Sequence, residues 1–95
     1  MNLRNYAKGK TCQIRLPGCT EGPACLAHLR TADTGYGQKE NDLLGAWSCQ
    51  NCHDIVDGRK GLPPAYRECF DVKQAFYDGI IRTQKNLVEE KIVKW

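Results

Sequence analysis

Six cysteines in a chain of only 95 residues limit what this sequence can fold into more than any other feature. A chain of this length buries only about two-thirds of the surface that its unfolded form exposes, so packing alone leaves a narrow margin of stability. Small domains rich in cysteine are usually held together by disulfides or by a bound metal. We therefore expect one domain over residues 1–95, with a metal-bearing half over residues 1–60 and a helical half over residues 61–95.

The beginning of the chain favours a metal over disulfides. Residues 1–8 contain no apolar run of the kind that forms the centre of a secretion signal. We therefore expect a cytoplasmic location, and in that reducing compartment cysteines are thiols or metal ligands. The expected stabilising group is zinc.

Composition argues against two classes of protein. With 41% hydrophobic and 26% charged residues, the chain is not a disordered tail. Its apolar runs are only a few residues long, so we expect no membrane-spanning segment. The formal net charge of +3 is mild, and it is compatible with DNA binding without requiring it.

The first cysteine pair flanks a predicted hairpin. Apolar and polar side chains alternate over residues 13–16, which predicts a short strand. Pro17-Gly18 is a turn pair that would fold Cys19 back beside Cys12. The other elements expected in this half are strands over residues 25–30 and 43–47, a polar loop over 31–42, and a short helix over 52–57 that is capped by Asn51 and closed by Gly58.

The second half has a helical pattern. After Pro63-Pro64, apolar side chains recur at intervals of three and four residues. Two helices that meet at Gly79, or one helix kinked there, are expected to pack over the metal-bearing half. Residues 92–95 are expected to form a short edge strand.

A Cys-x-x-Cys segment, Cys49-Gln50-Asn51-Cys52, supplies the second cysteine pair. A thioredoxin-type redox pair requires a βαβ unit around it, which this sequence lacks. A structural zinc requires four sulfur or nitrogen ligands. The predicted zinc ligands are Cys12, Cys19, Cys49 and Cys52, with Cys25 as the competitor for one position and Cys69 as a buried apolar thiol.

Both histidines lie in the same half as the cysteine pairs. His53 follows the Cys-x-x-Cys segment directly, and Asp57 is four residues further on. On a helix these two side chains share a face and could bind one divalent ion together. His28 is predicted on a strand between Ala27 and Leu29, where an ordinary surface histidine is unusual.

This combination resembles the HNH endonuclease ββα-metal motif, in which a strand histidine and a second strand precede a Cys-x-x-Cys-His that opens a helix. The chain resembles more closely the small YbcO-like nuclease family of phages and prophages. The resemblance implies an α+β fold, namely a small zinc-stabilised ββα-metal domain with C-terminal helices packed on it. It rests on residues 3–9, 12–18, 26–28, 49–54 and 79–83, and so extends over nearly the whole chain.

The resemblance also implies an activity. The chain would be a metal-dependent DNA endonuclease in which His28 acts as general base and activates water for attack on a phosphodiester. His53, with Asp57, would bind a catalytic Mg, Mn, Ni or Zn ion that stabilises the charge developing on the phosphate. The role would lie in phage recombination or DNA processing.

Two positions depart from the HNH pattern. Ala27 stands where a metal-binding Asp or His usually precedes the base, and Leu44 stands where the motif has Asn. Asn41 and Asp42 are close to that position, and we select Asp42 as the second catalytic residue. These departures keep an alternative open, namely a non-catalytic zinc module that binds nucleic acid or assists recombination.

Basic residues flank the two histidines. Arg30 lies two residues after His28, on the same face of a strand, and is the preferred phosphate contact. Arg59 and Lys60 follow the predicted helix and are further candidates. The expected partner is DNA; a homodimer and phage recombination proteins are further alternatives.

Overall fold

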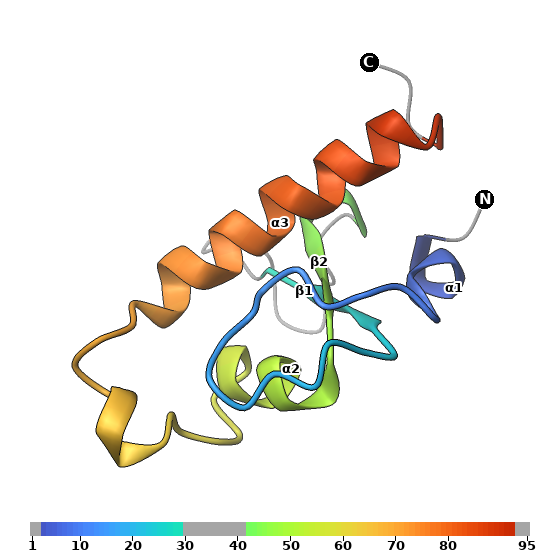
Figure 1. The fold of residues 1–95 in the computed structure, drawn as a ribbon. Coiled ribbons are helices and arrows are strands. Elements are labelled where there is room, and N and C mark those ends of the chain that lie inside the picture. The colour runs from blue at the N-terminus through green and yellow to red at the C-terminus, as the bar shows by residue number, and fades with distance from the viewer. Residues whose placement is uncertain (1–2, 30–41, 93–95) are drawn as a thin grey trace, which may run out of the picture.

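The computed structural model describes residues 3–29 and 42–92, and at its centre is a two-stranded antiparallel sheet. Strand β1 (Cys25–His28) pairs with β2 (Gly45–Ser48) so that Cys25 lies opposite Ser48 and His28 lies opposite Gly45. Helix α3 (Val72–Glu89) packs along β2, and helix α1 (Leu3–Ala7) packs against β1 (Figure 1). The elements in order are α1 (Leu3–Ala7), β1 (Cys25–His28), the 3-10 turn η1 (Asp42–Leu44), β2 (Gly45–Ser48), α2 (Gln50–Val56), the 3-10 turn η2 (Pro64–Tyr66) and α3 (Val72–Glu89).

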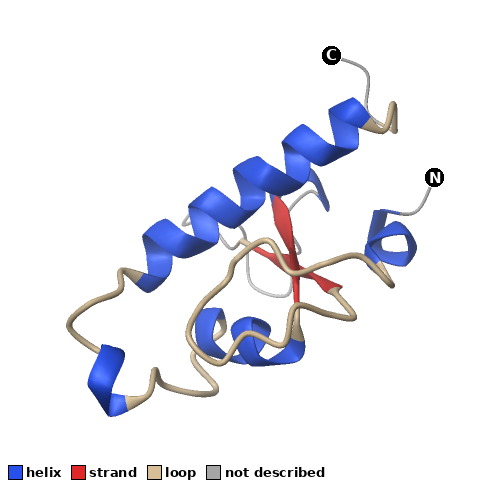
Figure 2. Ribbon diagram, in the orientation of Figure 1, coloured by secondary structure: helices blue, strands red, loops and turns tan. Residues whose placement is uncertain are grey.

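The α+β class is confirmed, and so are the two later strands and the short helix that follows them. Figure 2 shows the strands in red among helices, with long tan connections. Helix α1 was not predicted. In the part of the chain that the structure describes, no helix is both long and apolar enough to cross a lipid bilayer.

The predicted first strand is wrong, because residues 10–24 form an irregular loop. Ile14 and Leu16 are buried, as the alternation predicts. The preceding polar residue, Gln13, is buried too, so polar and apolar side chains are not separated into an exposed and a buried face. Arg15 has a φ of +63°, which an extended strand does not permit. The predicted turn does form, since the backbone N–H of Cys19 donates to the Leu16 carbonyl at 2.9 Å.

Helix α3 is continuous, whereas two helices or a kink were expected at Gly79. The glycine serves a close approach instead: a Cβ placed there would lie 2.8 Å from Cγ1 of Ile14 and 3.2 Å from the carbonyl oxygen of Gln13. Gly79 thus lets the irregular loop pack directly on the helix backbone.

The prediction for Cys69 is also wrong. Helix α3 begins only at Val72, and residues 63–71 are exposed. Cys69 is therefore exposed rather than part of the core. In Figure 1 this yellow segment extends away from the rest of the molecule.

The sheet separates two groups of buried side chains. Ala27 and Ala46, which pair across the strands, belong to one group, while Trp47 belongs to the other. Successive side chains of a strand point to opposite faces, which explains the division. The larger group is Cys12, Ile14, Leu16, Ala27, Ala46, Cys49, Cys52, Ile55, Leu62, Phe76 and Ile80, and the smaller is Ala7, Ala24, Trp47 and Leu87.

The free edge of β2 is closed by hydrogen bonds from other elements. The N–H of Gln13 donates to the Trp47 carbonyl at 2.7 Å. The Trp47 N–H donates to Oγ1 of Thr83 at 2.9 Å, and this hydroxyl donates to the Gly79 carbonyl at 2.8 Å. Thr83 thereby fixes α3 to the strand that leads into α2.

Candidate metal centre and histidine site

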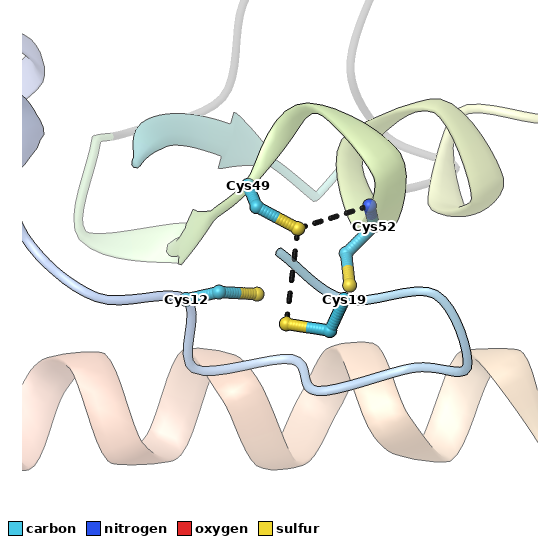
Figure 3. A group of neighbouring side chains, drawn as sticks. All are labelled: Cys12, Cys19, Cys49 and Cys52. Carbon is cyan, nitrogen blue, oxygen red and sulfur yellow. Dashed lines mark hydrogen bonds between the residues drawn. The ribbon is translucent and has the colours of Figure 1, made fainter. Parts of the chain in front are cut away.

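Four cysteines from two distant segments meet at the start of α2. Cys12 and Cys19 come from the irregular loop, and Cys49 and Cys52 flank the first turn of the helix. Their sulfur atoms all lie within 4.8 Å of one another, and Figure 3 shows them pointing toward a common centre. Three of the four side chains are buried, and Cys19 is partly buried.

The geometry fits a tetrahedral metal. Thiolates bound at about 2.3 Å to a tetrahedral zinc lie about 3.8 Å from one another. The sulfur atoms of Cys19 and Cys49 are 3.8 Å apart. Among residues 3–29 and 42–92, these four cysteines are the group of three or more potential metal ligands whose ligand atoms lie this close together. The group consists of the four predicted cysteines and does not include Cys25.

Backbone N–H groups point at the sulfur atoms. The N–H of Cys52 donates to Sγ of Cys49, the N–H of Leu16 donates to Sγ of Cys52 at 3.4 Å, and the N–H of Glu21 donates to Sγ of Cys19 at 3.3 Å. Such donors stabilise negative charge on sulfur, which a metal-bound thiolate carries.

The helix cap differs from the prediction. The N-cap of α2 is Cys49, not Asn51. The Asn51 side chain instead donates to the Pro17 carbonyl at 3.1 Å and accepts from Nζ of Lys60. Asn51 therefore ties α2 to the Pro-Gly turn that carries one of the cysteine pairs.

The pKa values of the thiols diverge inside the cluster. A hydrogen bond from Cys52 lowers the pKa of Cys12 to about 4, and the same bond raises the pKa of Cys52 above its ordinary value. Burial raises the pKa of Cys19 to about 11. This hydrogen bond therefore favours the thiolate form of Cys12 and the thiol form of Cys52.

A second group of side chains forms a row between β1 and α2. Sγ of Cys25 lies 3.1 Å from Nδ1 of His53, and Nε2 of His53 lies 3.0 Å from Oδ2 of Asp57. Nη2 of Arg59 is 3.6 Å from the same carboxylate oxygen. The expected helix face shared by His53 and Asp57 is thus present. The contact with Cys25 was missed, because it depends on the strand register that places Cys25 opposite Ser48, just before α2.

His28 has a different partner. Its Nε2 lies 2.6 Å from Oδ1 of Asp42, and Nε of Arg4 lies 3.5 Å from the same oxygen. The hydrogen bond from His28 lowers the pKa of the Asp42 carboxyl below its ordinary value. Since a carboxylate only accepts, we assign the proton of this bond to Nε2. The contact of Arg4, from α1, with Asp42 was not predicted from the sequence.

Members of both histidine groups line one surface hollow. It has a volume of about 490 Å³ and is lined by His28 at the end of β1, by Asp57 and Arg59 after α2, and by residues of α3. Lys60 is directed to Asn51 instead. Arg30 and Asn41 lie outside the described residues. The catalytic, metal-binding and DNA-binding roles of the residues around this hollow stay predictions.

Comparison with known proteins identifies a family model and two similar proteins. Residues 1–92 match the family model described as "Putative nuclease YbcO". The chain is 36% identical over 97 residues to "Putative nuclease YbcO" of Escherichia coli (strain K12), covering 98% of this chain and 97% of that protein. "Putative nuclease ybcO" of Enterobacteria phage 82 has the same identity and coverage.

A solved structure is also similar. It is described as "Structure of a putative bacteriophage protein from Escherichia coli str. K-12 substr. MG1655". The TM-score is 0.74 at 32% sequence identity, covering 95% of this chain and 100% of the other. Relatives of this chain therefore occur in a bacterium and in a bacteriophage.

Proposed function

Because the chain belongs to the family described as "Putative nuclease YbcO", we propose that it is a metal-dependent DNA endonuclease of the HNH type. The order of elements supports this proposal, since two antiparallel strands precede the helix that carries His53. The observation that carries it is the pair formed by His28 and Asp42, with their atoms 2.6 Å apart, at a hollow that Asp57 also lines. In this proposal the four cysteines hold a structural zinc, which fixes the irregular loop to the start of α2.

His28 would act as the general base. Asp42, ionised at neutral pH, accepts the proton on Nε2 and so holds the imidazole in one orientation and one tautomer. The unprotonated Nδ1 can then take a proton from the water that attacks phosphorus. Arg4 adds a positive charge beside Asp42, which favours the ionised carboxylate.

His53 and Asp57 would hold the catalytic divalent ion. Two ligands in neighbouring positions of an octahedral ion, each at about 2.1 Å, lie about 3.0 Å apart, and the facing atoms of this pair are 3.0 Å apart. When bound, such an ion stabilises negative charge on the phosphate and on the leaving oxygen. Cys25, at the other ring nitrogen, would fix the orientation of the His53 ring.

Arg59 and Lys60 would contact the phosphates of DNA, together with Arg30; Lys60 would exchange its hydrogen bond to Asn51 for one to a phosphate. The Arg59 side chain is 66% exposed and lines the hollow. Its distances to the carboxylates of Asp54 and Asp57 are 3.9 and 3.6 Å, long enough that a phosphate can compete for the guanidinium. Phosphate contacts of this kind give affinity that does not depend on sequence.

One observation favours a second function, a zinc module that binds nucleic acid without cutting it. Ala27, at the position where HNH enzymes have a metal ligand, is 0% exposed and packs in the larger buried group. The catalytic ion would therefore have fewer protein ligands than the motif supplies.

A nicking assay separates the two functions. Supercoiled plasmid and branched DNA are incubated with the protein and Mg, Mn, Ni or Zn, and His28→Ala is compared with wild type. Removing a general base should slow cleavage by about 100-fold or more. Gln74→Ala, an exposed change on α3, serves as the matched control and should cut at the wild-type rate. No cleavage by wild type with any of the metals would leave the non-catalytic module as the function, and equal cleavage by His28→Ala would reject His28 as the general base.

A further inference from the structure

One wall of the hollow that His28 lines belongs to α3, which lies outside the ββα part of the fold. Its lining residues there are Lys73, Phe76 and Tyr77. None of them has a role in the hydrolysis proposed above. Phe76 is buried and belongs to the core, so it forms the base of this wall. The other two side chains are exposed and face a site that is proposed to hold DNA.

The charge of the hollow favours an anion. Two of its lining residues, Arg59 and Lys73, are positively charged, and one, Asp57, is negatively charged. Among residues 3–29 and 42–92, Lys73 takes part in no ion pair, so its ammonium is available to a ligand. Two cations that approach one hollow from α2 and α3 can contact the same phosphate or neighbouring phosphates.

Tyr77 adds a different kind of surface. Its side chain is 42% exposed, and within the described chain its ring does not pair with another aromatic ring. An exposed aromatic ring beside cations is the arrangement that proteins use to stack bases of single-stranded nucleic acid. In a continuous duplex both faces of each base are covered by neighbouring bases, so only an unpaired or extruded base can stack on a protein ring.

We propose that the hollow binds an unpaired nucleotide of DNA, with its phosphate between Arg59 and Lys73 and its base against Tyr77. This inference rests on the proposed function and adds a substrate class to it. The preferred DNA has an unpaired nucleotide beside the scissile phosphate, as in a single strand or at a branch. The volume of about 490 Å³ is within the range of sites that hold small organic ligands.

The test measures binding without cleavage. Fluorescence anisotropy compares a labelled single-stranded 12-mer of mixed sequence with its duplex, at fixed salt and without added divalent ion. Wild type should bind the single strand more tightly. Tyr77→Ala should weaken single-strand binding by about tenfold, Tyr77→Phe should restore it, and duplex binding should not change. Lys73→Gln should weaken both and lower the salt dependence by about one counterion.

Tyr66→Ala is the matched control. Tyr66 is exposed to the same degree, at 44%, but it pairs with Phe70 on the segment before α3 and does not line the hollow. The inference is overturned if Tyr77→Ala binds the single strand as well as wild type, if Tyr66→Ala weakens binding equally, or if the duplex binds as tightly as the single strand. Thermal melting of each variant checks that it is folded.

The outcome is independent of whether the chain cuts DNA. Selective single-strand binding through Tyr77, with no cleavage under any metal, would support the nucleotide site and reject the nuclease. Cleavage that depends on His28, with Tyr77→Ala equal to wild type on branched and on continuous DNA, would support the nuclease and reject the nucleotide site.

Discussion

Replacing Thr83 by Val should destabilise the protein although the shape of the side chain hardly changes. Thr83 is 1% exposed, and its hydroxyl accepts from the Trp47 N–H and donates to the Gly79 carbonyl. The carbonyl keeps its helical partner four residues on, so the group left without a partner is the Trp47 N–H. Trp47 is itself buried, and water cannot replace the lost acceptor.

The expected cost follows from that single donor. A buried N–H without an acceptor costs about 1–3 kcal/mol, and valine recovers only a small part through its extra apolar surface. In a domain of this size each kcal/mol lowers the melting temperature by about 4–8 °C, so the expected decrease is about 5–20 °C. Against a typical total stability of about 5–15 kcal/mol, this is a large effect.

Urea unfolding and amide hydrogen exchange measure the result. Thr83→Ser is the matched control, because it keeps the hydroxyl and loses one buried methyl group, at a cost of about 1 kcal/mol. The Trp47 amide should lose exchange protection in Thr83→Val and keep it in Thr83→Ser. If Thr83→Val is as stable as wild type, or if both variants expose the Trp47 amide equally, the hydrogen bond does not hold α3 to β2.

Three further predictions concern the loop, the cysteine cluster and the acidic pH range. Gly79→Ala should lower the melting temperature despite the higher helix propensity of Ala, because its Cβ would collide with Ile14, whereas Gly61→Ala, with no atom within 4 Å of the added carbon, should not. Native mass spectrometry should find one zinc per chain, and Cys52→Ser should lose it and unfold at a lower temperature; a stable, metal-free wild type would contradict this. Because the folded pKa of Asp42 is depressed, its stabilising contribution is fully present above the ordinary pKa and is lost as the pH falls through the folded value. Asp42→Asn should therefore reduce the change in urea midpoint between about pH 3 and pH 6, and an unchanged acid profile would contradict the assignment.

The cysteine cluster could be predicted because its chemistry is local. The turn at Pro17-Gly18 returns the chain by itself, and a Cys-x-x-Cys segment needs only a helix start to bring its two sulfur atoms together. Local sequence patterns could not predict the backbone conformation of the loop between Cys12 and Cys19. Burial of Gln13 and the positive φ of Arg15 depend on α3, which accepts the loop at Gly79.

The contacts of the histidines were less accessible to sequence reasoning. Asp42 could be selected from its place near the motif, but Arg4 approaches it from α1, about forty residues away in the chain. Likewise, the contact between Cys25 and His53 follows from strand register, which no single segment encodes. By contrast, the shared face of His53 and Asp57, the C-cap of α2, was predicted from spacing alone.

Helix α3 has a consequence for how the protein is made. It contributes Phe76 and Ile80 to one buried group and Leu87 to the other, and Thr83 between them holds the edge of β2. All of these residues leave the ribosome after the cysteines and histidines that they support. The earlier segments therefore lack the α3 surface that they pack against while they are being synthesised. We expect the domain to acquire its native state only after α3 has been translated.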